Sequence, residues 1–145
     1  MQVQIVLQEK GSDVVTAAPG MSLRDVIALL DEKRIGAVVV SSDGVRLDGI
    51  VSERDVVRAL AREGAAALSR TAVEVMTTGE LCTCTPDDTV ESLMTTMTDR
   101  RVRHIPVVVD GAISGLVSIG DVVKSRISVL EHEARAMHDY ISNPY

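Results

Sequence analysis

Two Ser-x-x-Asp motifs carry the side chains of this sequence that could take part in chemistry. Ser52 is followed three positions later by Asp55, and Ser118 is followed by Asp121. Each motif follows a short apolar run and opens a predicted helix, so free backbone N–H groups and the positive helix end favour a phosphate there. The hydroxyl can donate to a phosphate oxygen, and the carboxylate can accept from both hydroxyls of a ribose. Each motif therefore predicts a corner that binds ribose and phosphate together.

The same spacing is also typical of an ordinary helix N-cap. A serine with an acidic residue three positions later stabilises a helix by about 1 kcal/mol without any ligand. Ser22 and Asp25 have this spacing as well, and there we expect capping alone. Binding is expected only at the two motifs that follow a glycine-led strand.

An internal duplication places these two motifs in equivalent positions. With Pro19 set over Pro86, the sequence matches itself at an offset of 67 residues as far as the Asp-Gly pairs at 43–44 and 110–111. A one-residue gap then changes the offset to 66, and residues 49–58 match residues 115–124. A match of this length, with its one gap at a turn, indicates a tandem duplication.

Each copy is expected to have the element order β-α-β-β-α. The first copy should contain an extended segment at 14–16, a helix from Ser22 to Lys33, strands at 37–40 and 49–52, and a helix from residue 53. The second should contain an extended segment at 81–83, a helix with Val90, Leu93, Met94 and Met97 on its apolar face, strands at 105–109 and 115–118, and a helix after Ser118. The Asp-Gly pairs are hairpin signals between the strands. The link at 62–79 should be partly helical, with a capping box at Thr71–Glu74.

Neither copy is expected to be stable alone. A unit of about 60 residues buries too little surface, so the copies should pack together about a pseudo-twofold axis. The expected fold class is α/β (α+β), with two β-α-β-β-α repeats and a long C-terminal helix. The expected boundaries are 8–68 for repeat 1, 69–130 for repeat 2 and 131–145 for a C-terminal helical extension.

The C-terminal helix carries a heptad-type apolar stripe. No helix breaker occurs between Asp121 and Asn143. The apolar positions are separated alternately by four and three residues: Val123, Ile127, Leu130, Ala134, Met137 and Ile141. Such a seam either folds back on its own chain or packs against a second subunit.

The paired Gly-apolar-Val-Ser-x-x-Asp stretches, the run Arg103–Val107 and the repeated element order resemble a tandem cystathionine-β-synthase (CBS) domain pair, or Bateman module, of the stand-alone two-repeat type. The resemblance covers about residues 13–130. It implies a non-enzymatic regulatory module that binds an adenosine-containing ligand (AMP, ADP, ATP, NAD or S-adenosylmethionine) in clefts between the repeats. It also implies a disc-like homodimer, so we expect dimer contacts through the helices of the repeats and through the C-terminal helix, whose seam packs against the second subunit. Such a dimer signals to a regulated protein through a ligand-driven change in repeat or dimer arrangement. In such a module Asp55 and Asp121 bind ribose, and Ser52 and Ser118 face phosphate.

Basic residues distinguish the second copy from the first. Arg103 and His104 are the expected phosphate partners, whereas Gly36 and Ala37 stand at the equivalent positions of the first copy. The Asp121 cleft is therefore expected to bind phosphate better, although a solvated helix end would also favour such cations. By position, the candidates for contact with the adenine ring are Thr16, Val38, Thr83, Thr85, Ile105 and Pro106, and Ala37 is a further candidate for ligand binding.

Composition excludes several functions. The formal net charge is −6, which argues against a general nucleic-acid binder. There is no Trp or Phe, and the aromatic residues are Tyr140 and Tyr145, so aliphatic side chains must hold any flat ligand. No apolar run approaches the roughly 20 residues that span a bilayer, and a cytoplasmic protein without membrane contact is expected.

Catalytic motifs are missing from the sequence. It contains no phosphate loop, no dinucleotide-binding glycine motif, no zinc-protease motif and no nucleophile elbow, so no enzyme, metal or required cofactor is expected. Two alternatives stay open. One is an interaction module with empty clefts, in which the C-terminal helix recruits a partner. The other is a redox-linked regulator that uses Cys82 and Cys84.

Overall fold

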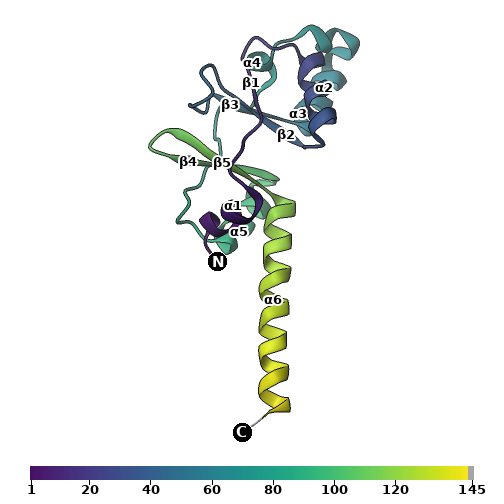
Figure 1. The fold of residues 1–145 in the computed structure, drawn as a ribbon. Coiled ribbons are helices and arrows are strands. Elements are labelled where there is room, and N and C mark those ends of the chain that lie inside the picture. Colours follow the sequence, from purple (N-terminus) through teal and green to yellow (C-terminus); the bar gives the residue numbers. More distant parts are fainter. Residues whose placement is uncertain (144–145) are drawn as a thin grey trace.

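The structure, a computed structural model, describes residues 1–143 as two lobes with one long helix that leaves them (Figure 1). The first lobe contains the first copy: β1 (Thr16–Ala17), α2 (Leu23–Lys33), β2 (Ala37–Val40), β3 (Gly49–Ser52) and α3 (Glu53–Glu63). Its sheet has the order β1-β2-β3, with β1 parallel to β2 and β2 antiparallel to β3. The predicted β-α-β-β-α order is confirmed for this copy.

The second lobe contains the second copy: α5 (Val90–Arg100), β4 (His104–Val109), β5 (Ala112–Ser118) and α6 (Ile119–Ser142). β4 and β5 pair antiparallel, with a bulge between Val107 and Val108. The extended segment expected at 81–83 forms no strand. A single parallel bridge between Cys84 and Val107 takes its place, so the edge of this sheet is shorter than its counterpart in the first lobe.

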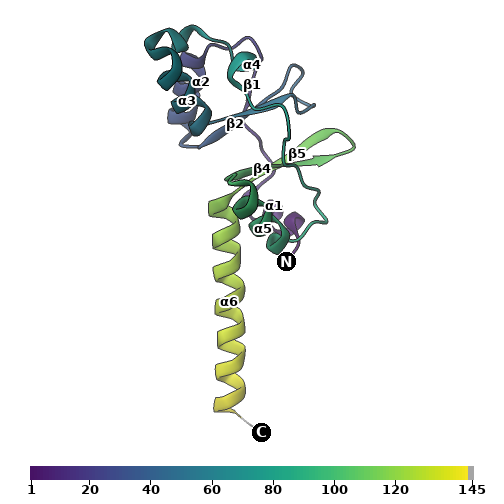
Figure 2. The same ribbon diagram turned by 180° about the vertical axis from the view of Figure 1, so that it is seen from behind.

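The segments that precede the two copies are exchanged between the lobes. Helix α1 (Val3–Lys10), which the sequence analysis did not predict, packs in the second lobe, and both ribbon views place it beside α5 (Figures 1 and 2). The 3-10 helix η1 (Gly64–Ser69) and helix α4 (Ala72–Val75) pack in the first lobe. Each hydrophobic core is therefore completed by a segment that precedes the other copy.

Equivalent backbone hydrogen bonds hold the two exchanged segments. The Val90 N–H donates to the Met1 carbonyl at 2.9 Å, and the Leu23 N–H donates to the Arg70 carbonyl at 2.7 Å. Val90 lies 67 positions after Leu23, which is the offset of the repeat. The exchange thus follows the pseudo-twofold relation between the copies.

Gly49 in β3 and Gly115 in β5 make room for the exchanged segments. A Cβ atom at Gly49 would lie 2.5 Å from the sulfur of Met76, and one at Gly115 would lie 2.6 Å from Cδ2 of Leu7. Both separations are shorter than van der Waals contact, so a larger residue at either position would force the Met76 or Leu7 side chain to shift.

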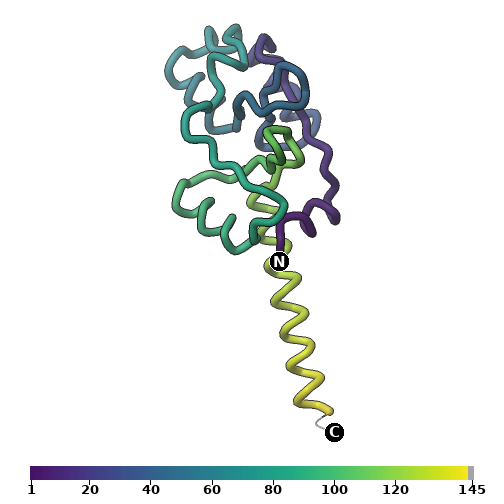
Figure 3. Tube along the Cα trace, turned by 90° about the vertical axis from the view of Figure 1, so that its left-hand side faces the viewer, coloured from purple at the N-terminus to yellow at the C-terminus, as the bar shows by residue number. Residues whose placement is uncertain are grey.

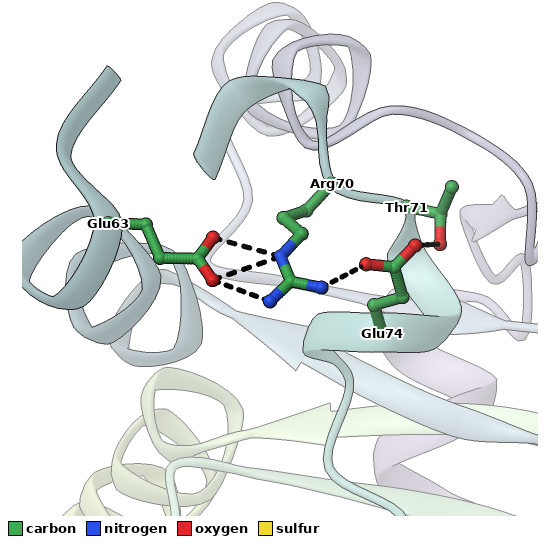
Figure 4. Close-up of polar contacts among 4 residues, drawn as sticks. All are labelled: Glu63, Arg70, Thr71 and Glu74. Atoms are coloured by element: carbon green, nitrogen blue, oxygen red, sulfur yellow. Dashed lines mark hydrogen bonds and ion pairs between the residues drawn. The ribbon is translucent and has the colours of Figure 1, made fainter. Parts of the chain in front are cut away.

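Arg70 fastens the linking segment to the first lobe (Figure 4). Its Nε donates to Glu63 Oε2 at 2.9 Å, and its Nη1 donates to Glu74 Oε2 at 2.5 Å. These hydrogen bonds hold the pKa of both carboxyl groups below the usual value. The capping box predicted at Thr71 is wrong: its hydroxyl donates to the Glu74 carboxylate at 3.0 Å and accepts no cap hydrogen bond. Arg70 holds the Glu74 carboxylate, and in this position the carboxylate accepts the hydrogen bond from the Thr71 hydroxyl.

The two hairpin connections differ from one another. Asp110 and Gly111 both have positive φ angles, 50° and 79°, as a tight type I′ turn requires. Asp43 instead lies in a longer loop, residues 41–48, where its carboxylate accepts from the backbone N–H groups of Val45 and Arg46. This loop reaches the second lobe, because the Val45 carbonyl accepts from the N–H of Ile113 at 2.8 Å.

Helix α6 runs far beyond the lobes, and the side view shows that it does not return to them (Figures 1 and 3). Ile127 is 51% exposed, Leu130 48% and Met137 67%. The alternative in which the seam folds back on its own chain is therefore wrong. Across residues 1–143, every helix is too short or too polar to cross a membrane.

Candidate functional site

Both Ser-x-x-Asp motifs form complete capping boxes. Ser118 Oγ accepts from the Asp121 N–H at 3.2 Å, while Asp121 Oδ2 accepts from the Ser118 N–H at 2.8 Å. Ser52 and Asp55 form the same pair, with distances of 3.4 Å and 2.8 Å. The capping expected at Ser22 is confirmed, since its Oγ accepts from the Asp25 N–H at 3.2 Å. Helix capping therefore explains the spacing of all three motifs. Only the residues around each motif can show which of them could also bind a ligand.

A cleft of about 360 Å³ lies over one of these motifs and not over the other. It is lined from both copies and from the segment that precedes them: Lys10, Asp13, Val14, Val15, Arg34, Ile35, Gly36, Ala37, His104, Leu116, Ser118 and Asp121. Ser118 and Asp121 thus face a space whose opposite wall belongs to the first copy. Its volume falls within the range of small-molecule sites.

An ion pair closes one end of this cleft. Lys10, the last residue of α1, donates from Nζ to Asp121 Oδ2 at 2.6 Å and to the Leu116 carbonyl at 2.7 Å. Burial by itself raises the pKa of Asp121, but the hydrogen bonds from Lys10 and Ser118 outweigh it and hold this pKa below the usual value. The carboxylate is therefore ionised at neutral pH and is held by a cation.

The equivalent acid of the first copy has a different partner. Oδ1 of Asp55 accepts from the hydroxyl of Thr77 at 3.1 Å. The backbone of Thr77 also pairs with Ile50 through two hydrogen bonds, of 2.9 Å and 3.2 Å. Neither Asp55 nor Ser52 lines the 360 Å³ cleft. The two corners therefore differ in the partner of the acid, Lys10 against Thr77, as well as in the residues at 103 and 104.

His104 forms part of the cleft wall. It begins β4 opposite Ser118, and a Cβ atom at Gly36 would lie 3.0 Å from its Cε1. Burial lowers the pKa of His104, while the charges of Glu53 and Asp121 oppose that change only in part. The imidazole is therefore neutral at neutral pH, and it can donate one hydrogen bond and accept another.

Four of the predicted site residues come together in this cleft: Ala37, His104, Ser118 and Asp121. The others that the sequence singled out do not line it: Thr16, Val38, Ser52, Asp55, Thr83, Thr85, Arg103, Ile105 and Pro106. Val38, Ile105 and Pro106 are buried, whereas the side chain of Arg103 is exposed. Thr85 belongs to a turn in which its N–H donates to Asp88 Oδ2 at 2.7 Å.

Several lining residues were not among the predicted site residues. These are Lys10, Asp13, Val14, Val15, Arg34, Ile35, Gly36 and Leu116. Gly36 had been placed in the other cleft, beside Asp55. The crossed arrangement of the copies explains this, because the start of β2 faces the corner of the second copy. Lys10 lies before the matched part of the repeat, so the duplication could not have pointed to it.

A second depression, of about 440 Å³, lies on the outer face of the first lobe. Its lining comes mostly from α2 and α3: Ile27, Leu30, Asp31, Arg34, Ile35, Gly36, Glu53, Val56 and Val57. We call it the α2–α3 groove. Val57 in its wall is 64% exposed, so this groove is an apolar surface and not an enclosed site.

The cysteines and metal ligands form no reactive centre in the part of the chain that the structure describes. Cys82 and Cys84 are free thiols that pack against the core of the second lobe. Burial raises the pKa of Cys84 to about 12, which keeps it a protonated and unreactive thiol at neutral pH. Among residues 1–143, no three His, Cys, Asp or Glu side chains gather as a metal site would require.

The fold and the cleft define a class of protein: a pair of fused α/β repeats with a cleft between them. The model of the CBS domain family matches residues 10–62 and 72–128, so the chain belongs to that family. The resemblance inferred from the paired motifs is confirmed.

Known relatives agree with this assignment. The chain is 36% identical over 124 residues, 83% of its length, to the CBS domain-containing protein CBSX3, mitochondrial, from Arabidopsis thaliana, and it spans 60% of that relative. Among solved structures, the CBS-domain containing protein ATU1752 from Agrobacterium tumefaciens is 43% identical, with a TM-score of 0.83, over 87% of this chain and 99% of that one. The CBS domain protein PAE2072 from Pyrobaculum aerophilum, solved in complex with AMP, is 26% identical, with a TM-score of 0.76, over 90% of this chain and 97% of that one.

Proposed function

We propose that this chain is a non-enzymatic regulatory module that binds an adenosine-containing ligand (AMP, ADP, ATP or NAD) in the cleft at Asp121. One observation carries the proposal: the Ser118–Asp121 corner of the second copy faces a wall built by the first copy. A ligand in this cleft would touch both copies at once. The AMP complex of the Pyrobaculum relative supports the choice of ligand class.

Each part of the cleft has a role in this proposal. Asp121 accepts from the ribose hydroxyls, and Ser118 with the N-terminus of α6 faces a phosphate. Neutral His104 adds a further donor. Aliphatic side chains of Val15, Ile35 and Leu116 hold the adenine ring, because the lobes contain no aromatic residue that could stack on it.

Lys10 competes with a ribose diol for Asp121. Its ammonium and the Ser118 N–H both bind Oδ2, so a diol that uses both carboxylate oxygens displaces Lys10. Once displaced, Lys10 is a flexible cation beside the ligand and is available to a phosphate. Binding would in this way favour anionic nucleotides over the neutral nucleoside.

The regulatory step follows from a ligand that bridges the copies. Binding shifts the equilibrium between two arrangements of the lobes, by no more than the difference in affinity for them. The shifted arrangement is then read by an unidentified regulated protein. A cytoplasmic location belongs to the same proposal, since two free thiols suit a reducing compartment.

A thermal-shift titration with AMP, ADP, ATP and NAD tests the proposal. A ligand at one hundred times its dissociation constant stabilises the folded state by about 2.7 kcal/mol. Asp121→Ala should abolish the shift, whereas Asp25→Ala removes the equivalent acid of a helix N-terminus outside the cleft and should leave it unchanged. If none of the four ligands gives a shift, or if the shift survives Asp121→Ala, the proposal fails.

We also propose that the chain works as a homodimer, through the α2–α3 groove and α6. Open apolar surface of this kind supports a protein interface. Light scattering coupled to size exclusion should give twice the monomer mass of 15.5 kDa. The exposed seam of α6 also favours a second candidate function, an interaction module with empty clefts, which would bind a partner and show no nucleotide response.

A further inference from the structure

The α6 seam is an exposed apolar surface that the cleft does not use. It consists of the heptad positions Val123, Ile127, Leu130, Ala134, Met137 and Ile141. The large side chains in it are 48% to 71% exposed, and all lie on a helix that leaves the lobes (Figures 1 and 3). A continuous stripe of this kind marks an interaction site.

We infer that the α6 seam pairs with the same seam of a second copy, as a parallel, in-register, two-stranded coiled coil. The inference rests on the proposed homodimer and does not depend on nucleotide binding. The α6 seam has the heptad period of a coiled coil. Its a positions are Ile127, Ala134 and Ile141, and its d positions are Val123, Leu130 and Met137.

The charges beside the seam match in a parallel pair. In that orientation each g position faces the e position five residues further along the other helix. Arg126 then faces Glu131 of the second copy, and Glu133 faces His138 of the second copy. The first pair attracts, and the second attracts whenever the imidazole is protonated.

The same charges disfavour an antiparallel pair. An antiparallel pair keeps all six apolar layers only when Val123 lies against Ile141 of the second copy. In this register the twofold axis of the pair crosses the helix between Leu130 and Ala134. Equivalent e positions and equivalent g positions then meet near that axis, so Glu131 faces Glu131 and Glu133 faces Glu133. Like charges in these positions oppose pairing, and other antiparallel registers lose apolar layers.

Contacts within the chain leave the seam free to pair. Val122 and Ser125 bury the opposite side of the first turns of α6 against the second lobe. The ion pairs of Arg126 with Glu91 and of Arg135 with Glu131, both at 3.9 Å, are exposed and therefore weak. Arg126 and Glu131 can exchange these partners for each other across the interface at little cost.

A parallel coiled coil fixes how two copies of the protein lie. Because α6 begins in the second lobe, the second lobes of the two copies come side by side at the same end of the coil. The dimer is then isologous, with its twofold axis along the coil. Nucleotide-driven changes in the two protomers would reach the coil from equivalent positions.

Disulfide crosslinking tests the orientation directly. In a Cys82→Ala, Cys84→Ala background, Ile141→Cys should crosslink to the same position of the second copy under mild oxidation. In the antiparallel pair, the two thiols would lie about 27 Å apart, from the rise of the helix. Asp139→Cys, on the outer face of the coil in either orientation, is the matched control and should not crosslink. A dimer without the crosslink at position 141 overturns the coiled coil and leaves the proposed dimer standing.

A charge variant should change the dissociation constant of the dimer in opposite directions for the parallel and the antiparallel pair. Glu131→Gln removes two attractive pairs from the parallel dimer and should raise its dissociation constant about threefold in sedimentation equilibrium. In the antiparallel dimer it removes a repulsion and would lower that constant. Asp139→Asn makes the same charge change outside both interfaces and should have no effect. A protein that stays monomeric overturns this inference and the proposed dimer together, while the thermal-shift titration still decides nucleotide binding by itself.

Discussion

The ammonium of Lys10 lies 2.6 Å from the carboxylate of Asp121, so the acid that we assign to ribose is already held by a cation. The equivalent acid, Asp55, is held by the neutral hydroxyl of Thr77 at 3.1 Å. The duplication has therefore kept both acids and given them partners of different charge. We expect this difference to make ligand binding in the Asp121 cleft depend on the charge of the ligand.

Removing the Lys10 ammonium should change which ligand the cleft prefers. In Lys10→Met, Asp121 is free to accept from the ribose, but the cation available to a phosphate is gone. The ratio of AMP affinity to adenosine affinity should fall by about tenfold, the value of one charge-assisted hydrogen bond. Isothermal titration calorimetry with both ligands measures this ratio. Lys33→Met, on an exposed lysine of α2, should leave the ratio unchanged, and an equal change for both ligands would contradict the role given to Lys10.

The buried His104 should make stability depend on pH below neutrality. Burial lowers its pKa in the folded state relative to 6.5, so the unfolded chain takes up a proton first as the pH falls. The stability that His104 contributes is therefore complete well above pH 6.5 and is lost as the pH falls from there toward the lowered folded value. Urea unfolding at pH 7.5 and pH 5.5 should show a larger loss in the wild type than in His104→Gln.

Exposed histidines serve as the control for this effect. His132→Gln changes a residue of α6 outside the lobes and should lose as much stability as the wild type over the same interval. If His104→Gln loses as much as the wild type does, the imidazole is not the group responsible.

The exchanged segments predict the cost of adding one methyl group at a strand glycine. Gly115→Ala places a Cβ against Leu7, and overpacking of this kind should cost about 1–3 kcal/mol in urea unfolding. Adding Leu7→Ala should recover part of the loss, so that the double variant is more stable than the sum of the two single changes. Gly20→Ala, with open space around it, is the control. Additive losses would mean that Leu7 does not rest on this strand.

Much of this fold could be predicted from the sequence because the copies keep one pattern. The apolar spacing of α2 and α5 and the position of Ser52 and Ser118 predicted the helices and the strand-to-helix corners correctly. Helix α1 was missed because only Val3, Val6 and Leu7 of its residues are buried, which is too short an apolar pattern to stand out. The packing of α1 in the second lobe depends on contacts between residues far apart in the sequence, which local residue spacing cannot predict.

The cleft was predicted only in part for the same reason. Ser118 and Asp121 were found because capping and binding need the same residues at the same spacing. The opposite wall, with Val15 and Ile35, depends on how the copies cross, and Lys10 lies beyond the matched part of the repeat. Adenine candidates such as Val38 and Ile105 proved to be buried in the cores, where an apolar strand residue is most often found.

Alkylation separates the regulatory module from a redox-linked regulator. Because burial raises the pKa of Cys84 to about 12, only a very small fraction of it is thiolate at pH 8, and iodoacetamide should leave it unmodified in the native protein. In 8 M urea the same residue should react fully, which peptide mass analysis would show. Cys84→Ser should also leave the nucleotide response of the native protein unchanged. Rapid modification of native Cys84, together with loss of the nucleotide response on oxidation, would instead favour a thiol switch. A buried and protonated thiol cannot act as such a switch.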